Sequence, residues 1–99
     1  MKRLVSVLIP AKDEEKSIGK VLKDLNIVIK KAKKYRFEVI VIDDKSADKT
    51  GAIAKNYGAM VIINSGKSGK GKALALGFKH AKGDYIVMLD ADYSHMPKD

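Results

Sequence analysis

The sequence predicts an α/β fold, a parallel sheet of about four strands flanked by three helices in a single Rossmann-like domain. Apolar runs alternate with segments of helical periodicity along the chain, and no linker or low-complexity stretch separates them. Such alternation is typical of parallel strands joined by right-handed crossovers. The usual doubly wound order, 3-2-1-4, places a switch point between the first and fourth strands. Ligands in such sheets bind beyond the carboxyl ends of the strands at that point.

Composition and charge narrow the class of protein. With 99 residues, of which 45% are hydrophobic and 32% charged, the chain fits one soluble globular domain. It contains no cysteine, which excludes disulfides and thiolate metal sites. Its apolar runs fall short of the ~20 residues that span a bilayer, so we expect a cytoplasmic protein. The net charge is +8, and many of the lysines responsible fall on one predicted helix. With no Trp and two Phe, the chain offers few aromatic rings for stacking on bases, so we expect no nucleic-acid partner.

The first strand is predicted over residues 4–9, a nearly continuous apolar run of the kind that is covered on both faces. A helix follows over 18–32, where apolar residues recur at steps of three and four. Glu14 and Glu15 are expected in or near its first turn, where carboxylates suit the helix dipole. The second strand is predicted over residues 37–42.

The second helix is expected to be short. Ser46 or Asp48 can cap its start through a side-chain oxygen, and Gly58 is placed to stop it. Residues 59–63 then form the third strand.

A loop rich in Gly, Ser and Lys over 65–71 precedes the third helix, whose apolar positions fall within 73–78. Gly83 is expected to end this helix. Residues 85–89 form the fourth strand, which delivers Asp90 at its tip.

Acidic residues follow three of the predicted strands, at the edge where ligands bind in this fold class. Glu14 comes after the first strand, residues 43–44 after the second, and residues 90–92 after the fourth. Mg²⁺ and Mn²⁺ favour a few carboxylates together with phosphate oxygens and water. Asp90 and Asp92 are therefore candidate ligands of one divalent metal. The alternative is that they only begin a turn.

Asp43 and Asp44 are candidates for the nucleotide itself, because an acidic residue at this strand end commonly binds a ribose hydroxyl or a base edge. A turn or helix-capping aspartate ahead of Ser46 is the alternative for one of the pair. Pro10 and Glu14 form either a rigid wall of the same site or simply a strand stop and a helix start.

Gly66 to Lys72 nearly match the phosphate loop GxxxxGK[ST], between a strand and a helix as that motif requires. Ala73 stands in place of the hydroxyl that coordinates magnesium, and the loop follows the third strand rather than the first. A phosphate-loop nucleotide-binding protein is therefore one alternative, and a basic nucleic-acid-binding α/β domain is another. Lys67, Lys70 or Lys72 can also neutralise a diphosphate outside such a loop.

Three stretches together resemble one family. Residues 7–15 (VLIPAKDEE), 38–50 (EVIVIDDKSADKT) and 69–99, which end in LDADYSHMPKD, are similar in order and spacing to family-2 glycosyltransferases of the GT-A fold. The likeness is greatest to members similar to dolichol-phosphate mannose synthase. It implies inverting transfer of a hexosyl group, mannosyl or glucosyl, from a nucleotide diphosphate sugar (GDP-mannose or UDP-glucose) to a lipid phosphate such as dolichyl phosphate.

The resemblance also implies a divalent metal, Mn²⁺ or Mg²⁺, and a set of site residues. Residues expected at the nucleotide sugar are Pro10, Ala11, Glu14, Asp43, Asp44, Lys72, Asp90, Ala91 and Asp92. The expected metal ligands are Asp90, Asp92 and Ser94. No catalytic residue is assigned within the chain.

Three positions depart from the family pattern. Lys45 stands where glycine usually follows the paired aspartates, so that turn must accommodate a side chain. Asp13 replaces a common asparagine, and Lys12 a common aromatic or small residue. These departures bear on the identity of the nucleotide more than on the fold.

Family catalytic domains continue well past the DxD motif, which is Asp90-Ala91-Asp92 here, whereas this sequence ends at Asp99. We therefore expect residues 1–99 to be the N-terminal, nucleotide-binding part of a glycosyltransferase, cut after the motif and inactive alone. In the 3-2-1-4 order the apolar run 85–89 lies at a sheet edge, which invites self-association with a second copy. The basic surface suits contact with an anionic membrane at its cytoplasmic face.

Overall fold

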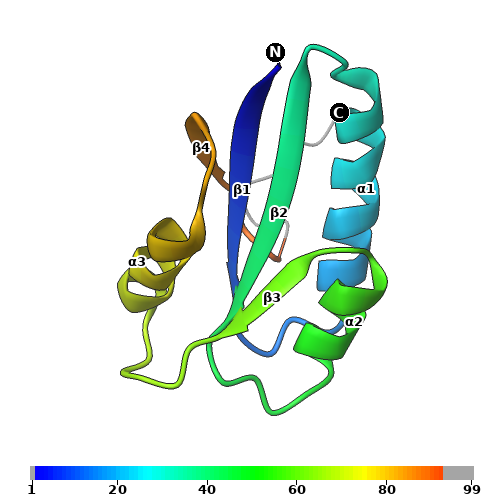
Figure 1. The fold of residues 1–99 in the computed structure, drawn as a ribbon. Coiled ribbons are helices and arrows are strands. Elements are labelled where there is room, and N and C mark those ends of the chain that lie inside the picture. The colour runs from blue at the N-terminus through cyan, green and yellow to red at the C-terminus, as the bar shows by residue number, and fades with distance from the viewer. Residues whose placement is uncertain (1, 93–99) are drawn as a thin grey trace.

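The computed structural model describes residues 2–92, which form a sheet of four parallel strands with three helices (Figure 1). The elements are β1 (Arg3–Ala11), α1 (Ile18–Lys31), β2 (Tyr35–Asp43), α2 (Thr50–Asn56), β3 (Met60–Ile63), α3 (Lys70–His80) and β4 (Tyr85–Met88). The strand order is β3-β2-β1-β4, so the predicted fold class and the order 3-2-1-4 are confirmed. Over residues 2–92, no helix combines the length and apolar character needed to cross a membrane.

The helices divide between the two faces of the sheet, with α1 and α2 on one face and α3 on the other (Figure 1). Because side chains alternate along a strand, β1 contributes to both cores. Val7 and Ile9 belong to the core that includes Leu22 of α1, and Leu8 to the core that includes Ala73 of α3. Burial on both faces explains the continuous apolar run of the first strand.

A glycine lets α3 approach the sheet closely. A Cβ on Gly77 would lie 2.8 Å from Cδ1 of Ile42 and 3.2 Å from Cδ1 of Leu8. Close docking of α3 fixes the position of its first residue, Lys70, relative to the carboxyl ends of β1 and β2.

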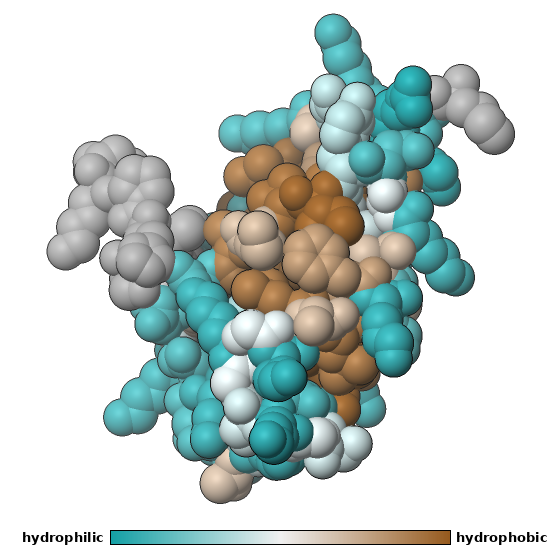
Figure 2. Space-filling view, turned by 90° about the vertical axis from the view of Figure 1, so that its left-hand side faces the viewer, coloured by the Kyte–Doolittle hydropathy of each residue, from teal (hydrophilic) through white to brown (hydrophobic). Residues whose placement is uncertain are grey.

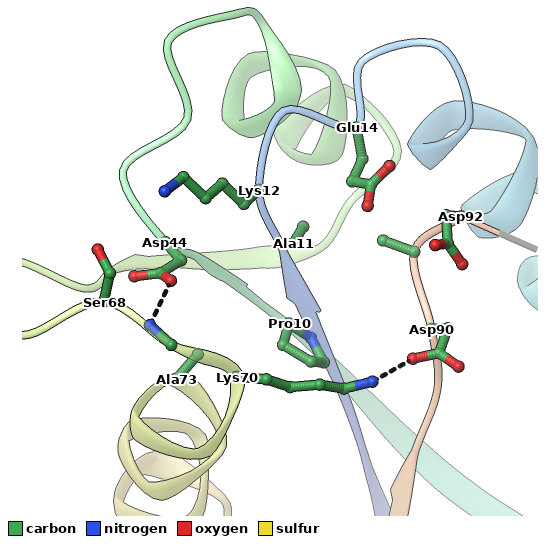
Figure 3. Close-up of a pocket in the computed structure, with 12 residues that line it drawn as sticks. Pro10, Ala11, Lys12, Glu14, Asp44, Ser68, Lys70, Ala73, Asp90 and Asp92 are labelled. Carbon is green, nitrogen blue, oxygen red and sulfur yellow. Dashed lines mark hydrogen bonds and ion pairs between the residues drawn. The ribbon is translucent and has the colours of Figure 1, made fainter. Parts of the chain in front are cut away.

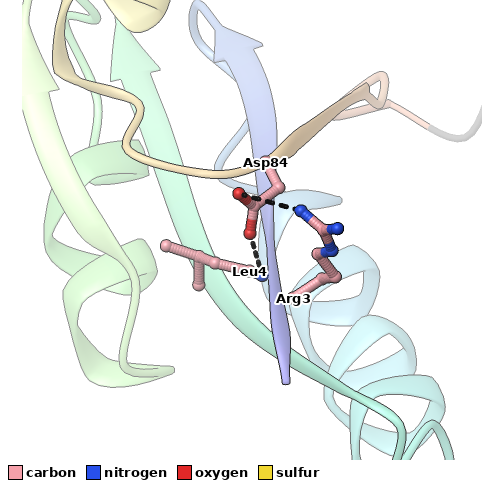
Figure 4. Close-up of polar contacts among 3 residues, drawn as sticks. All are labelled: Arg3, Leu4 and Asp84. Carbon is pink, nitrogen blue, oxygen red and sulfur yellow. Dashed lines mark hydrogen bonds and ion pairs between the residues drawn. The ribbon is translucent and has the colours of Figure 1, made fainter. Parts of the chain in front are cut away.

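Asp84 joins the start of β4 to the start of β1 (Figure 4). Its Oδ2 accepts a hydrogen bond from the backbone N–H of Leu4 at 2.9 Å, and its own N–H donates to the Leu4 carbonyl at 2.7 Å. The Arg3 guanidinium lies 3.8 Å from Oδ1 of Asp84. Exposed ion pairs contribute little, so the two backbone contacts do most to fix the register.

A buried hydroxyl holds the loop between α3 and β4. The fully buried Ser6 accepts the N–H of Gly83 at 2.8 Å and donates its hydroxyl to Oε2 of Glu38. The same Glu38 oxygen accepts the backbone N–H of Lys82 at 2.7 Å. Ser6 and Glu38 together thus join β1 and β2 to the loop that leads into β4.

The start of α1 lies later than the two glutamates. The helix begins at Ile18, and its first turn carries no acidic residue. The N–H of Glu14 binds Oγ1 of Thr50, and the N–H of Glu15 binds Oδ2 of Asp48. These contacts hold the segment against the neighbouring loop, so the helix starts only beyond it.

The start of α2 also differs from the expected cap. Lys49 occupies the N-cap position, rather than Ser46 or Asp48. Asp48 nonetheless accepts the N–H of Thr50, the first helical residue, at 3.0 Å, which satisfies one donor at this helix end. Gly58, with φ +87°, follows the C-cap as predicted.

Candidate functional site

A cavity of about 520 Å³ lies beyond the carboxyl ends of β1, β2 and β4 (Figure 3). This is the edge of the sheet where the sequence predicts a site. The lining residues come from four segments far apart in the chain and are Pro10, Ala11, Lys12, Glu14, Asp44, Ser68, Gly69, Lys70, Ala73, Asp90, Ala91 and Asp92. The structure thus brings together seven of the expected nucleotide-sugar residues.

One wall of the cavity is acidic, formed by Glu14, Asp90 and Asp92 (Figure 3). Burial, and after it the charge of Asp92, raises the pKa of Glu14 above its ordinary value. Carboxylate oxygens are ligands that Mn²⁺ and Mg²⁺ accept, so these side chains fit a divalent metal. No group of three or more His, Cys, Asp or Glu within residues 2–92 is poised as a metal site. A divalent metal at these carboxylates would take its further ligands from phosphate oxygens and water.

The expected third ligand, Ser94, lies outside the described residues.

The opposite wall supplies Lys70, one of the three lysines that the sequence offers for a diphosphate. The ammonium of Lys70 lies 2.7 Å from Oδ1 of Asp90, and this contact raises the pKa of Lys70. Lys72, the lysine expected at the nucleotide, is not among the lining residues. Two residues further along a helix point about 200° away, and α3 begins at Lys70 itself. The position of the helix start was the missing signal.

The DxD turn is anchored on the far side by α1. The Ser17 hydroxyl, at the N-cap of α1, donates to the carbonyl of the buried Ala91 at 2.8 Å. This bond fixes the backbone between the two aspartates. The two aspartates that flank Ala91 both line the cavity.

Asp44 lines the cavity, but both its oxygens bind the chain itself. Oδ2 accepts the N–H of Gly69 at 2.8 Å, and Oδ1 accepts Nδ2 of Asn64 at 2.9 Å. The Gly69 hydrogen bond, supported by Asn64, holds the pKa of Asp44 below its ordinary value. In this arrangement Asp44 positions the loop that leads into α3.

Asp43 points elsewhere. Its Oδ1 accepts the N–H of Ser46 at 2.9 Å, and a Cβ on Gly51 would lie 3.0 Å from its Oδ2. Asp43 lines a second cavity beside α2 instead of the one at the acidic wall. Contact of either paired aspartate with a base or ribose stays a prediction.

Two loops at this edge bind each other reciprocally. The N–H of Asp13 donates to Oγ of Ser46 at 2.8 Å, and Oδ1 of Asp13 accepts the N–H of Ala47 at 2.7 Å. Glu15 likewise accepts the N–H of Lys49 at 3.1 Å. Together with the contacts of Glu14 and Glu15 to the second loop, these bonds join the β1–α1 and β2–α2 loops into one wall.

Two backbone N–H groups of the loop before α3 bind the chain itself. Phosphate loops direct successive backbone N–H groups at a phosphate. Here the N–H of Gly69 binds Asp44, and the N–H of Gly66 binds Oδ1 of Asn64 at 3.2 Å. The geometry therefore favours the carboxylate-rich cavity over the phosphate-loop alternative.

Sequence comparison identifies relatives of known class. The chain matches the family model described as Glycosyl transferase family 2 over residues 6–99. It is 31% identical over 98 residues to the dolichol-phosphate mannosyltransferase of Pyrococcus furiosus, and this alignment covers 95% of this chain and 27% of that protein. It is 34% identical over 97 residues to a dolichyl-phosphate beta-glucosyltransferase of Trichomonas vaginalis, with coverage of 89% and 30%. The chain spans 22% to 42% of the length of the curated relatives compared.

Solved structures share the fold. Glucosyl-3-phosphoglycerate synthase of Mycobacterium tuberculosis, in complex with Mn²⁺, UDP and glucosyl-3-phosphoglycerate, superposes with a TM-score of 0.79 at 31% identity, covering 91% of this chain and 34% of that one. Mannosyl-3-phosphoglycerate synthase of Rubrobacter xylanophilus superposes with a TM-score of 0.83 at 24% identity, covering 91% and 31%. The fold is that of the GT-A glycosyltransferases. The chain therefore belongs to glycosyl transferase family 2.

Proposed function

We propose that this chain forms the donor-binding part of a glycosyltransferase and holds a nucleotide diphosphate sugar against a divalent metal at Asp90 and Asp92. The observation that carries the proposal is the cavity of about 520 Å³ in which these aspartates face Lys70. Its size is in the range of small-molecule sites. Its opposed charges suit a metal diphosphate, which presents both a cation and anionic oxygens.

The relatives support the ligand class. The mycobacterial synthase crystallised with Mn²⁺ and UDP, and in another complex with Mn²⁺ and UDP-glucose. The two relatives named for dolichol phosphate transfer mannosyl and glucosyl groups by their names. GDP-mannose and UDP-glucose are therefore the two donors we propose, with Mn²⁺ or Mg²⁺ as the metal.

The proposed reaction is hexosyl transfer with inversion. An acceptor oxygen forms a bond to the anomeric carbon, the bond from that carbon to the diphosphate oxygen breaks, and a nucleoside diphosphate leaves. When bound, the metal neutralises the charge that grows on the diphosphate. Asp90 and Asp92 hold it in place, Lys70 adds positive charge, and Pro10 and Ala11 border the nucleotide.

The acceptor we propose is a lipid phosphate such as dolichyl phosphate. Its oxygen is already ionised near neutral pH, so the transfer needs no general base. The net charge of +8 suits approach to an anionic membrane surface. We accordingly place the protein in the cytoplasm, with contact to the cytoplasmic face of the membrane.

Calorimetric titration tests the donor site. The chain is titrated with GDP-mannose and with UDP-glucose, each with and without Mn²⁺. We expect binding of one donor that requires Mn²⁺ and weakens about tenfold or more in Asp92→Asn, a change of ~1.4 kcal/mol. Asp24→Asn, which removes the same charge from the exposed surface of α1, serves as the matched control and should bind normally.

Two results count against the proposal. If a folded chain binds neither donor, these residues do not form a donor site. If binding is equal with and without Mn²⁺, or is unchanged by Asp92→Asn, the aspartates do not hold a metal.

A further inference from the structure

A cation already lies on one of the proposed metal ligands. Nζ of Lys70 is 2.7 Å from Oδ1 of Asp90, and the lysine side chain runs past Pro10 to reach it (Figure 3). The Lys70 side chain is 62% exposed and that of Asp90 is 20% exposed. The ammonium is therefore the partner with room to move, and the carboxylate is the partner held by its surroundings.

We propose that Lys70 couples metal binding to diphosphate binding in this cavity. Its ammonium neutralises Asp90 while the site is empty, and it moves to a diphosphate oxygen when a divalent metal takes Asp90. This inference rests on the proposed function. It adds a positioning residue to that function, and it makes the affinity for metal depend on whether nucleotide is bound.

Charge repulsion provides the first reason. A metal ion and an ammonium on the same carboxylate would lie within a few ångströms of each other, where like charges repel strongly in a partly buried site. One of them must leave, and Lys70, whose side chain is 62% exposed, can be hydrated when it does. The metal therefore displaces Lys70, but it binds more weakly than it would at an uncompensated aspartate.

The geometry around Lys70 provides the second reason. The hydrogen bond from Gly69 to Asp44 holds the backbone just before Lys70, and Gly77 docks α3 closely against the sheet. The start of the helix is thus fixed while the four-carbon stem of the side chain can swing. A diphosphate bound at the same metal would offer anionic oxygens as new partners for the ammonium of Lys70.

The consequence is a thermodynamic linkage between two ligands. A diphosphate gives the displaced ammonium a new partner, so the metal binds more tightly when nucleotide is present. By reciprocity, the nucleotide binds more tightly when metal is present, by the same factor. Part of that factor depends on Lys70 and disappears when its charge is removed.

Mn²⁺ titrations followed by the electron paramagnetic resonance signal of free Mn²⁺ test this directly. They are performed without nucleotide and with saturating UDP or GDP on the wild type, Lys70→Gln and Lys79→Gln. We expect Lys70→Gln to bind Mn²⁺ more tightly than wild type without nucleotide, and to reduce the coupling factor by about fivefold or more. Lys79→Gln removes the same charge from the last turn of α3 and should match wild type. Lys70→Arg, which keeps the charge, should retain most of the coupling.

The outcomes separate the two claims. If the wild type couples Mn²⁺ to nucleotide and Lys70→Gln couples them equally, Lys70 forms only a surface ion pair and the inference is wrong while the donor site stands. If no variant binds Mn²⁺ or nucleotide, the proposed function and this inference both fail. Equal effects of Lys70→Gln and Lys79→Gln would show that overall charge, and no specific contact, sets the affinities, which also overturns the inference.

Discussion

Lys45 carries backbone strain at a position where glycine is typical of the family pattern. Its φ of +62° lies in the left-handed region, which a Cβ makes unfavourable by roughly 1–2 kcal/mol. Lys45→Gly should therefore raise the free energy of unfolding, by about 0.5–1 kcal/mol after the added flexibility of the unfolded chain is subtracted. Urea unfolding of the two proteins measures the difference.

Lys45→Ala is the matched control, because it removes the same charge but keeps the Cβ. It should show none of the gain. If alanine and glycine stabilise equally, loss of the lysine charge is the cause and backbone strain is not.

The second prediction at this scale concerns Asp44 and acid. Its folded pKa lies below the ordinary 3.8, chiefly because the N–H of Gly69 binds its charged form. The carboxylate therefore stabilises the fold above that value, and the contribution is lost as the pH falls through the folded pKa. Asp44→Asn should be about 1–2 kcal/mol less stable than wild type at neutral pH.

Urea unfolding from neutral pH down to about pH 2.5 measures the stability gap. The gap should narrow below 3.8, because only the wild type then loses its carboxylate. A gap that stays constant down to the lowest pH would mean that the ionised form of Asp44 contributes nothing special.

Single residues also show where sequence reasoning ends. Asp90, Asp92 and Glu14 could be placed at one site because the carboxyl ends of parallel strands share an edge. Which of Lys70 and Lys72 lines the cavity could not be decided without the exact first residue of α3, since a shift of two residues reverses the direction of a helical side chain.

At the scale of elements, the lack of a Cβ at Gly83 allows the loop before β4 to lie directly against Ser6 of β1. A Cβ there would lie 2.5 Å from Oγ and 2.7 Å from N of Ser6. Gly83→Ala should therefore destabilise the protein by about 2–3 kcal/mol, through overpacking and loss of the Ser6 hydrogen bond. Thermal and urea unfolding measure it.

Gly71→Ala is the comparison for that change. A Cβ at Gly71 meets nothing within 4 Å. It lies in the first turn of α3, where alanine is a better helix former than glycine. We expect Gly71→Ala to be neutral or stabilising, and equal losses in both variants would contradict the steric explanation.

The outer edge of β4 is an exposed apolar edge of the sheet. Within residues 2–92 it pairs with β1 alone, and residues 85–88 are 38% to 56% exposed. Figure 2 shows a hydrophobic patch on the side of the molecule that carries β4 and α3. Unpaired strand edges of this kind template association. We therefore expect self-association, with a second copy as the partner.

A second copy fits this edge by symmetry. Two β4 edges related by a twofold axis pair in antiparallel fashion, which brings the exposed apolar side chains of residues 85–88 of the two copies together.

Sedimentation velocity over a wide concentration range tests the association. The wild type should shift to a dimer with rising concentration, and Val87→Lys should stay monomeric because it buries a charge in the contact. Val28→Lys makes the same change at a 59% exposed position on α1 and should still dimerise. A wild type that is monomeric throughout would disprove the association.

Elements differ in how well sequence revealed them. The strands and helices themselves followed from the period of their apolar residues, because that signal is local. Gly58 stops α2 as predicted, but the predicted stop of α3 at Gly83 is wrong, since that helix ends at His80 with Ala81 as its C-cap. The Ser6–Gly83 contact joins residues far apart in sequence, and a serine within an apolar run carries no sign of its distant partner. The start of α1 at residue 18 is confirmed, whereas the contacts that hold Glu14 and Glu15 outside its first turn join distant residues and could not be predicted.

At the scale of the whole molecule, the strand order could be predicted because alternating strands and helices leave few right-handed arrangements. The edge that carries the cavity followed from the same topology. The direction of each paired aspartate did not, because Asp43 and Asp44 are sequence neighbours whose side chains face different cavities. Topology fixes which residues meet, and packing fixes which of them face the ligand.

The reciprocal hydrogen bonds between the β1–α1 and β2–α2 loops have a consequence for the entropy of binding. Ligands that must order a loop lose part of their affinity to that ordering. Here Asp13, Glu14 and Glu15 are already held by the second loop before any ligand arrives. A donor that enters this cavity meets a wall whose conformational freedom was given up during folding, so its affinity is not reduced by freezing that wall.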